Sequence, residues 1–464
     1  MLSLNGKDLR KIGFPQGPAI GLAIKAMQEH FPHYSKKEAL EILKKLVIQP
    51  ETYLNDERLS EVAALLRPQP KQVGDEISLR TEKVPTEIFG VEHIEGGALL
   101  QMENAARLPV AVAGALMPDA HAGYGLPIGG VLAAKNAVIP YGVGVDIGCR
   151  MTLSVYPLPA AMLRTDEKQL KKILTANTLF GAGKEFSKKT DHAVLERPEF
   201  YESGFLRQLQ SKAAAQLGTS GSGNHFVEFG RLEIIEEDAL LGLLPGDYLA
   251  LLSHSGSRGL GATIANHFTK LAMSLRRLPP EARHLAWLGL NEEAGAEYWL
   301  AMNLAGDYAS ACHHVIHEKI AHALGEQPLK MVENHHNFAW KELHGGEEVI
   351  VHRKGATPAG KDVLGIIPGS MTLPGFIVRG KGNEASLNSA SHGAGRRMSR
   401  TAAKKSITPQ QLKETLAAAG VTLIGGGLDE APQAYKDIHE VMAAQEELVA
   451  VLGRFWPAVV RMDD

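Results

Sequence analysis

The chain has 464 residues and a near-neutral formal charge of −3, with 44% hydrophobic and 22% charged residues. This composition is typical of a globular protein and excludes a wholly disordered chain. No apolar run reaches the ~18 residues of a membrane span, and the polar N-terminus does not predict a signal peptide, so we expect a cytoplasmic protein without membrane contact. Two cysteines exclude a disulfide framework. Any nucleic-acid site must be a local basic patch, because the total charge gives no basic field.

The first eighty residues predict a small helical region. Ser35 and Glu38 have the spacing of a capping box, and an apolar helical face follows from Leu40 to Val47. A second helix is predicted over residues 57–66, and the stretch 67–78, with two prolines, is typical of a linker. We therefore predict a helical N-terminal extension over residues 1–80 and one large domain over residues 81–464.

The large domain predicts a mixture of strands and helices. The predicted strands are 110–116, 128–134, 151–156, 226–230, 248–253, 347–352 and 375–379. The predicted helices are 165–176, 198–216, 259–275, 293–323, 409–419 and 434–452. Thr408, Pro409 and Gly420 mark the ends of the helix at 409–419. The strands come singly and in pairs without regular β–α alternation, which indicates an α+β fold.

Glycine is concentrated in segments that also carry polar residues. The chain has 48 glycines, roughly 10% where ~7% is usual. Eight glycine-rich segments lie between residues 117 and 430, and most contain His, Asp, Asn, Ser or Arg. Glycine lets a backbone approach a ligand closely, so these segments together predict one site built from loops. Each segment taken alone is better explained as a turn.

A carboxylate, a thiol and several imidazoles are candidates for a metal site. Asp146 and Cys149 stand three residues apart in the segment VDIGC. His225, His254 and one of the pair His335 and His336 each lie at the edge of a predicted strand, and spacing alone does not separate the last two. Thiolate, imidazole and carboxylate suit a borderline divalent metal, and a thiolate can bridge two ions. The alternative is that Cys149 is a buried apolar side chain.

His392 is a candidate nucleophile for phosphate chemistry. Small residues flank it, and Arg396, Arg397, Arg400, Lys404 and Lys405 follow. A neutral imidazole can attack a phosphate while guanidinium groups stabilise the developing negative charge. Arg258, and the cluster of Arg353 and Lys354 after His352, are further candidates to hold phosphate. The alternative is that the basic run is an ordinary solvated helix face.

The ordered motifs resemble those of one known family. The segments MPDAHAGYGLPIGG, VGVDIGC, GSGNHF, HSGSRG, HHNFA, HRKGAT, IPGSM, SHGAGRRMSR and EAPQAYKDI occur between about residues 80 and 440. In this order they are similar to RtcB, the family of GTP- and manganese-dependent RNA ligases. The resemblance implies a single α+β body with central sheets and a deep metal-bearing cleft. It implies two Mn²⁺ ions, the first on Asp146, Cys149 and His225, and the second on Cys149, His254 and His336.

The resemblance also implies a nucleotide site and a reaction. The implied guanine-nucleotide residues are Asn224, His225, Phe226, Val227, Glu228, His336, Asn337, Pro368, Gly369, Ser370, Met371, His392, Gly393, Ala394 and Gly395. His392 matches the histidine that takes GMP from GTP. GMP then passes to an RNA 3′-phosphate, formed from a 2′,3′-cyclic phosphate where needed, and a 5′-hydroxyl RNA end displaces it. RNA or phosphate contacts are expected from Arg258, Arg353, Lys354 and Arg396.

The chain departs from the family pattern at three places. Arg150 follows DIGC where the family usually has Gly, which predicts a new cation beside the metals. Gly375 stands where the family has a nucleotide-binding Ser. Met462 stands where it has a guanine-contacting Lys, and the neighbouring Arg461 is a candidate replacement. Two alternatives therefore stay open, a metal-dependent RNA phosphoesterase without nucleotidyl transfer and a non-catalytic RNA-binding protein.

Overall fold

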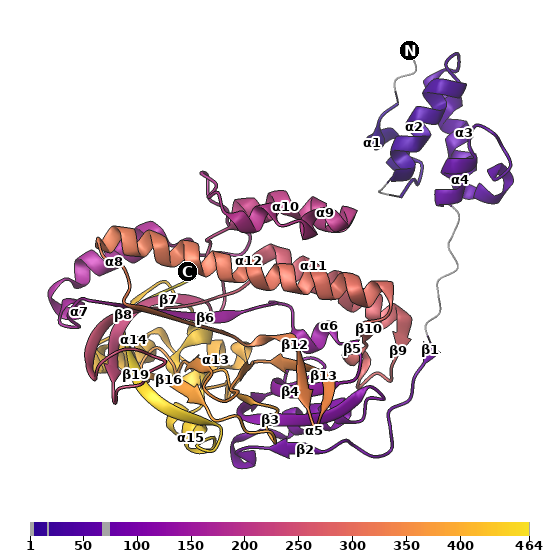
Figure 1. Ribbon diagram of the computed structural model, residues 1–464. Helices are drawn as coiled ribbons and strands as arrows, with labels where there is room; N and C mark the ends of the chain where they lie inside the picture. Colours follow the sequence, from indigo (N-terminus) through magenta and orange to yellow (C-terminus); the bar gives the residue numbers. More distant parts are fainter. Residues whose placement is uncertain (1–3, 16–17, 67–74, 464) are drawn as a thin grey trace. The chain divides into compact units, whose positions relative to one another are not determined.

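The N-terminal part of the chain is a compact helical unit of its own. The structure is a computed structural model that describes residues 4–15, 18–66 and 75–463, and the chain divides into the units Met1–Val73 and Gly74–Asp464. The first unit (indigo in Figure 1) contains α1 (Gly6–Lys11), α2 (Pro18–His30), α3 (Lys36–Ile48) and α4 (Ser60–Leu66). Its buried core includes Leu9, Met27, Leu43 and Leu46. The capping box between Ser35 and Glu38 is confirmed at the start of α3.

Two details of the N-terminal prediction differ from the structure. The second predicted helix is α4, which begins three residues later than expected. Helices α1 and α2 were not predicted, although Asn5 forms a capping box at the start of α1. The predicted linker 67–78 falls mostly outside the described residues, and only its last four residues, 75–78, are described. The large unit opens there with β1 (Asp75–Glu76), which pairs with β9 (Arg276–Arg277).

A large mixed sheet forms the centre of the second unit. Its strand order is β11 (Lys330–His335), β6 (Arg150–Tyr156), β8 (Gly246–Ser255), β7 (Phe226–Ile234), β19 (Val449–Met462), β16 (Gly375–Gly380) and β15 (Leu364–Ile367), with β18 (Thr422–Ile424) paired to β19. Both faces are buried: Leu249 and Leu251 pack into one apolar cluster, and Ala250 and Leu252 into another. This alternation follows from the two-residue period of a strand.

A second sheet of five strands lies beside the first (Figure 1). Its order is β12 (Asn337–His344), β13 (Glu347–Lys354), β4 (Ile128–Ala134), β3 (Ala111–His121) and β2 (Thr86–Ile88). Short pairs complete the strands, namely β5 (Ala137–Val138) with β10 (Leu288–Gly289), and β14 (Ala356–Pro358) with β17 (Ser389–Ser391). Helix α5 (Gly96–Ala106) packs on β3. The predicted α+β class is confirmed.

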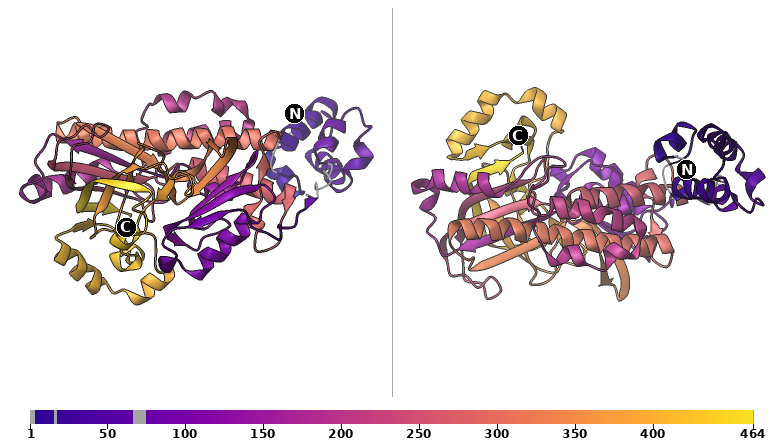
Figure 2. Two further views of the ribbon diagram at one scale, coloured as in Figure 1. Left: turned by 60° about the horizontal axis from the view of Figure 1, so that its bottom comes forward. Right: turned by 90° about the horizontal axis from the view of Figure 1, so that it is seen from above.

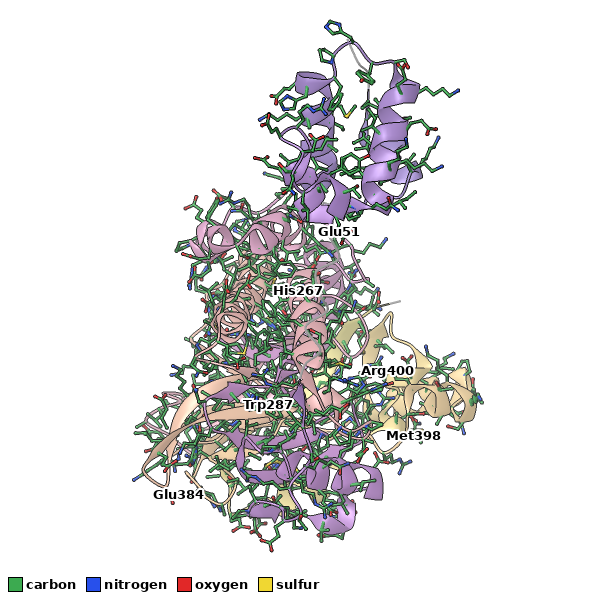
Figure 3. The ribbon with its side chains drawn as sticks, turned by 90° about the vertical axis from the view of Figure 1, so that its right-hand side faces the viewer. Glu51, His267, Trp287, Glu384, Met398 and Arg400 are labelled. Carbon is green, nitrogen blue, oxygen red and sulfur yellow. The ribbon has the colours of Figure 1, made fainter. Side chains whose placement is uncertain are left out.

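Long helices cover the large sheet on the side away from the C-terminal helices (Figure 2). They are α8 (Glu167–Asn177), α10 (Gly204–Gln216), α11 (Arg258–Leu275) and α12 (Glu293–Leu324). The shorter helices are α6 (Pro140–Val143), α7 (Met162–Thr165), α9 (Glu199–Glu202), α13 (Arg400–Ser406), α14 (Pro409–Ala419) and α15 (Ile438–Ala443). In Figure 3, His267 lies on α11 and Arg400 begins α13. Among the described residues, no helix is both long and apolar enough to cross a membrane.

The predicted helix at 434–452 is wrong. Only α15 is helical there, and residues from Val449 onward form β19, a central strand of 14 residues. Apolar residues dominate the start of this strand because it is buried between β7 and β16, and a continuous apolar run does not separate a buried strand from a helix. Pro457 is accommodated because the pairing register shifts between Pro457 and Val459. The predicted helix at 198–216 is divided at Ser203 into α9 and α10, because Ser203 is extended and caps the start of α10. The other predicted strands and helices of the large domain are confirmed within a few residues at their ends.

Candidate metal and nucleotide site

Sulfur and nitrogen atoms from four segments of the chain converge in the interior. Cys149 Sγ lies 3.4 Å from His225 Nε2 and 3.2 Å from His254 Nε2. His254 Nε2 lies 3.2 Å from His336 Nε2. Asp146 Oδ2 lies 3.0 Å from His225 Nε2. The structure therefore brings together all five side chains that the sequence suggested as metal ligands.

Strand pairing produces this convergence. Asp146 and Cys149 lie on the tight turn between α6 and β6, and His254 lies near the end of β8, where it pairs with residues at the starts of β6 and β7. The backbone N–H of His336 donates to the Cys149 carbonyl at 3.0 Å. Gly148 turns with a φ of +69°, and a Cβ there would lie 2.9 Å from the Gly306 backbone. Only glycine fits this position, because both the conformation and the space exclude a side chain.

The structure separates the two neighbouring histidines that spacing could not. His336 points toward His254, with ring centroids 5.1 Å apart. His335 instead packs against the rings of Phe338 and Trp340, at 5.0 and 4.9 Å. Successive residues of an extended chain point to opposite sides, so only one of the pair can face the cluster.

The cluster has the electronic properties of a cation site. Burial lowers the pKa of His254 to about 3, and burial together with Arg258 lowers the pKa of His225. Burial and the neighbouring histidines hold the pKa of His336 well below its ordinary value. These imidazoles are therefore neutral at pH 7 and their lone pairs are available. With a thiol and a carboxylate beside them, they fit a borderline divalent metal, and Cys149, His225 and His254 have donor atoms within 4.8 Å of one another.

Arg258 lies directly beside this cluster and lines a cavity. Its Nη2 is 3.0 Å from His225 Nδ1 and 3.8 Å from Asp146 Oδ2. The cavity has a volume of about 300 Å³, and its lining includes Asp146, His225, Arg258, Gln216 and the loop 181–184. Arg258 thus presents a nearly buried guanidinium where a phosphate can approach the metal ligands.

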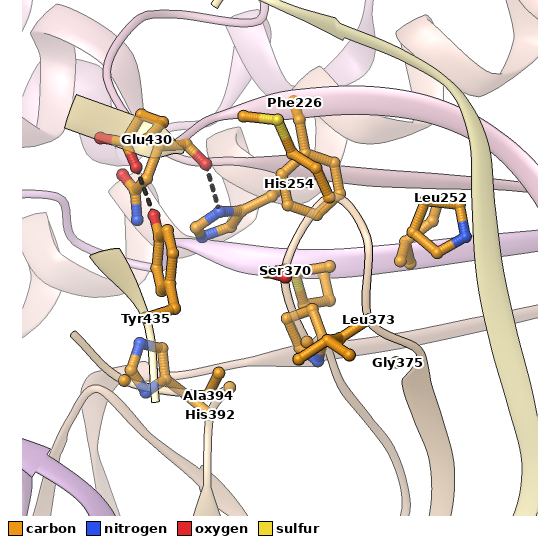
Figure 4. Close-up of a pocket in the computed structure, with 18 of the residues that line it drawn as sticks. Phe226, Leu252, His254, Ser370, Leu373, Gly375, His392, Ala394, Glu430 and Tyr435 are labelled. Atoms are coloured by element: carbon orange, nitrogen blue, oxygen red, sulfur yellow. Dashed lines mark hydrogen bonds between the residues drawn. The ribbon is translucent and has the colours of Figure 1, made fainter. Parts of the chain in front are cut away.

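A larger cavity adjoins the cluster on its other side (Figure 4). Its volume is about 310 Å³, and His254 and His392 both line it. The predicted nucleotide residues that line it are Asn224, Phe226, Glu228, Pro368, Gly369, Ser370, Met371, Gly375, His392, Gly393, Ala394, Gly395 and Met462. In Figure 4, Phe226 and His254 face the loop with Ser370, Leu373 and Gly375 across the space.

Other predicted nucleotide residues lie outside this cavity. Val227 is fully buried on the opposite face of β7 from Phe226 and Glu228. His225 and His336 belong to the candidate metal cluster, and Asn337 donates to the Asp146 carbonyl at 3.3 Å. These placements follow from strand alternation and from the turns that hold the metal ligands.

The suggestion that Arg461 replaces a guanine-contacting lysine is not supported by its position. Its guanidinium donates to the Leu174 carbonyl at 3.4 Å and lies 5.8 Å from the Phe180 ring centroid. Met462 lines the cavity instead. Neighbouring residues of β19 face opposite sides of the sheet, so Arg461 and Met462 cannot both reach the same space.

Glu228 places a carboxyl group in the cavity. It is nearly fully buried, and burial raises its pKa to about 8. An apolar surrounding disfavours the charged form of a carboxyl that has no cation beside it. A ligand that brings hydrogen-bond donors to Glu228 would stabilise the charged carboxylate and lower its pKa.

His392 is held by a buried aspartate that the sequence did not single out. Its Nδ1 donates to Asp119 Oδ2 at 2.6 Å, and its backbone N–H donates to the same oxygen at 3.2 Å. Asp119 is fully buried, whereas the His392 side chain is 17% exposed and lies 5.0 Å from the His336 ring. The available signal was an aspartate within the apolar strand segment ALMPDAH, where a buried acid is rare unless it is paired.

Comparison with known proteins shows the family of this chain. The sequence model of the family described as tRNA-splicing ligase RtcB matches residues 101–463. This chain belongs to the RtcB family. It is 37% identical to RNA-splicing ligase RtcB1 of Escherichia coli strain ATCC 25922, over 81% of this chain and 96% of the relative. It is 36% identical to RNA-splicing ligase RtcB of E. coli K12 over the same shares, and 30% identical to tRNA-splicing ligase RtcB of Nanoarchaeum equitans, over 81% and 95%.

The basic run of this RtcB chain is balanced by two acids. Arg396 pairs with Glu430 at 3.2 Å, and Arg400 pairs with Glu430 at 2.7 Å and with Asp429 at 3.3 Å. Tyr435 also donates to Glu430 (Figure 4). Arg396 and Arg400 still line the larger cavity, but their charge is partly neutralised by residues 29 to 34 positions away.

Arg353 is not positioned to contact RNA, so this prediction needs correction. It is fully buried, and its guanidinium forms a bidentate pair with Glu342, with Nη2 3.0 Å from Oε2. Its Nε donates to Ser389 at 2.8 Å, and the group stacks 4.7 Å from the Trp340 ring. Arg353 therefore stabilises the interior of the RtcB body.

Arg150, which stands where the resemblance implies Gly, also points away from the candidate metal ligands. It is nearly buried and forms an ion pair with Glu333. It donates to the carbonyls of Gly148 at 3.1 Å and Gly306 at 2.7 Å. The expected cation beside the metals is thus a structural link between β6, β11 and α12, and it supports the turn that carries Cys149.

Proposed function

We propose that this RtcB-family chain is a GTP-dependent RNA ligase that joins a 3′-phosphate or 2′,3′-cyclic phosphate end to a 5′-hydroxyl end. The observation that carries the proposal is the placement of His392 between Asp119, the histidine cluster and the larger cavity. A nucleophile, an orienting acid and an adjoining metal site are the parts that nucleotidyl transfer needs.

Two Mn²⁺ ions are the metals that we propose. Asp146, Cys149 and His225 would hold one, and Cys149, His254 and His336 the other. The ions would neutralise phosphate charge and orient the triphosphate. The mixed sulfur, nitrogen and oxygen donors of the buried cluster support this assignment.

In the first step His392 Nε2 attacks the α-phosphorus of GTP. The N–P bond forms, the bond from the α-phosphorus to the bridging oxygen breaks, and pyrophosphate leaves. The hydrogen bond from Nδ1 to Asp119 keeps the proton on Nδ1 and leaves the Nε2 lone pair free. Asp119 also stabilises the positive charge that develops on the ring.

Glu228 is the residue that we assign to guanine recognition. A carboxylate can accept hydrogen bonds from N1–H and the 2-amino group of guanine, whereas adenine presents an acceptor at N1. Glu228 faces the cavity, and its penalty for ionisation would fall as these donors replace an apolar surrounding. Met462 and Phe226 supply apolar surface around the base.

In the next steps GMP moves to RNA and then leaves. An oxygen of the RNA 3′-phosphate attacks the phosphorus on His392, so that the N–P bond breaks and a pyrophosphate linkage forms. The 5′-hydroxyl oxygen then attacks the RNA phosphate, GMP leaves, and the strand is sealed. A 2′,3′-cyclic phosphate is first opened by water. We assign Arg258 to a backbone phosphate of the RNA, because its guanidinium reaches the smaller cavity beside Asp146.

The catalytic body that we propose was expected at residues 81–464, after a helical extension over residues 1–80, and residues 75–80 are added to the body because β1 pairs with β9. The separate core of the N-terminal helices supports this division. A cytoplasmic location fits the free thiols of Cys149 and Cys312, because thiols are kept reduced in that compartment.

A circularisation assay tests this function. A linear RNA with a 5′-hydroxyl and a 3′-phosphate, incubated with GTP and Mn²⁺, should yield a sealed circle, and the same RNA with a 3′-hydroxyl should not. Release of inorganic phosphate without nucleotide, and no circle, would favour the metal-dependent phosphoesterase. That second candidate is favoured only by Gly375 and Met462, which line the cavity where the resemblance implies Ser and Lys.

A further inference from the structure

Three aromatic rings form a cluster in the large unit. Tyr124 lies 6.3 Å from Tyr141 and 5.8 Å from His284, and the last two are 5.1 Å apart, all between ring centroids. Tyr124 is 66% exposed, while Tyr141 and His284 are half-buried. The cluster therefore presents one open ring supported by two others.

The open ring belongs to a loop that borders the larger cavity, where we propose that GTP binds. Tyr124 stands between His121 and Ile128, and both of these residues line that cavity. The Gln101 amide donates to the Gly123 carbonyl at 2.6 Å and accepts from the Gly123 N–H at 3.0 Å. These two bonds fix the backbone beside Tyr124, so the ring is presented from a defined loop.

Two basic residues accompany the rings. Lys354 Nζ donates to the Tyr124 carbonyl at 2.5 Å and lies 4.9 Å from the Tyr141 ring centroid. Arg283 is exposed, and its Nε lies 3.2 Å from His284 Nε2. Burial lowers the pKa of Lys354 to about 7, and an anionic ligand nearby would favour its charged form. Aromatic faces beside cations are the chemistry that binds single-stranded nucleic acid.

Lys354 and Gly355 connect the cluster to the segments that carry the candidate metal ligands and His392. A Cβ on Gly144 would lie 3.9 Å from Lys354 Cε, and Gly144 is two residues from Asp146. On the other side of Lys354, a Cβ on Gly355 would lie 3.2 Å from His392 Cε1. Lys354, which contacts the Tyr124 carbonyl and the Tyr141 ring, therefore connects the cluster to the segment of Asp146, and its chain neighbour Gly355 lies against His392.

We propose that Tyr124, supported by Tyr141 and His284, stacks a nucleobase of the RNA strand whose 3′-phosphate reaches His392. The inference rests on the proposed ligase function and names a binding surface for one of its substrates. The 3′-phosphate strand is favoured because Lys354 and Gly355 lead from the rings to His392, which gives GMP to that end. The cavity at Arg258 has its own lining and is left for the other strand. Stacking accepts every base, so this surface tolerates any sequence.

Binding of a fluorescent RNA tests this assignment. The probe is a short single-stranded RNA with a 3′-phosphate and 2-aminopurine at its last nucleotide, bound to the full chain without GTP or metal. The wild type should quench the fluorescence. Tyr124→Ala should weaken binding by about 5-fold to about 100-fold and abolish the quenching, because it removes one stacked base. Tyr124→Phe should behave as the wild type, since it keeps the ring.

Tyr201→Ala is the matched control. Tyr201 lies on α9, is 53% exposed like the open ring of Tyr124, and also has a cation, Arg207, over its ring. It should leave RNA binding unchanged. If Tyr124→Ala binds and quenches the probe as the wild type does, the stacking proposal is wrong. If the wild type still circularises RNA in that case, the proposed ligase function stands. Quenching of 2-aminopurine placed at the 5′-hydroxyl end, if Tyr124→Ala abolishes it equally, would overturn the assignment to the 3′-phosphate strand. A wild type that neither binds the probe nor seals RNA would overturn both proposals.

Discussion

One oxygen of Asp119 accepts two hydrogen bonds from His392, from ring Nδ1 at 2.6 Å and from the backbone N–H at 3.2 Å. The aspartate therefore fixes both the position of the residue and the orientation of its ring. Because Asp119 is fully buried and His392 reaches the cavity, the acid acts on the ring without facing the ligand. This arrangement resembles the support of a general-base histidine by a buried aspartate.

Replacement of this aspartate should impair the transfer of GMP to the enzyme. Asp119→Asn keeps the size of the side chain but no longer selects the tautomer with a free Nε2, so we expect guanylylation to slow by about 100-fold or more. Single-turnover labelling with GTP measures this rate. Asp247→Asn, at an exposed ion pair with Arg231, serves as the control. A rate within about twofold of the wild type would show that Asp119 does not orient the nucleophile.

Metal affinity should rise with pH. Burial and the nearby Asp146 raise the pKa of the Cys149 thiol well above its ordinary value, so the thiol is protonated at neutral pH in the metal-free chain. Binding as a thiolate releases that proton, and affinity for Mn²⁺ should increase about tenfold per pH unit between about pH 6.5 and 8.5. Calorimetry in buffers of different ionisation enthalpy measures both affinity and proton release. Cys149→Ser should bind weakly and release no proton, and a wild type with pH-independent affinity would contradict the thiolate ligand.

Glu228 should lower the stability of the fold at neutral pH and contribute to nucleotide binding. Its folded-state pKa of about 8 exceeds the ordinary 4.5, so the folded chain holds a proton that the unfolded chain loses. Stability from this residue is therefore full below about pH 4.5 and falls as the pH rises towards 8. Glu228→Gln should stabilise the chain by ~2 kcal/mol at pH 7 and weaken GTP binding, because the amide presents a donor to guanine N1–H. Denaturant unfolding and GTP titration measure the two effects, and a variant that binds GTP normally would remove Glu228 from guanine recognition.

The buried pair of Arg353 and Glu342 should affect stability and not RNA binding. Arg353→Met removes the guanidinium from the Glu342 carboxylate, which keeps the His344 ring at 2.9 Å, and we expect a loss of about 3 kcal/mol in the free energy of unfolding. The double variant Arg353→Met, Glu342→Leu should recover most of this loss. RNA affinity of the folded double variant should equal that of the wild type. A selective loss of RNA affinity would restore Arg353 as a phosphate contact.

Local patterns in the sequence predicted most of the elements of the large domain. The helix at 409–419 was predictable because Thr408 and Gly420 provide its end signals within the segment itself. The error at β19 had the opposite cause, since its burial is set by pairing with β7 and β16, which are distant in the chain. Propensity gives no information about such partners.

The residues of the candidate site were also predictable only where they lie close together in the chain. Asp146 and Cys149 could be proposed together because three residues on a tight turn suffice to bring them close. Asp119 and His392 are 273 residues apart, so their contact depends on the fold. The faces of Arg353 and Arg461 follow from strand register, which the composition of a basic segment does not show.

The most direct test is labelling of the enzyme by GTP. The full chain is incubated with Mn²⁺ and GTP labelled at the α-phosphate, then separated under denaturing conditions. The account predicts an acid-labile, alkali-stable label on the wild type and none on His392→Ala. A wild type without label, or label that persists in His392→Ala, would contradict a covalent histidine–GMP intermediate.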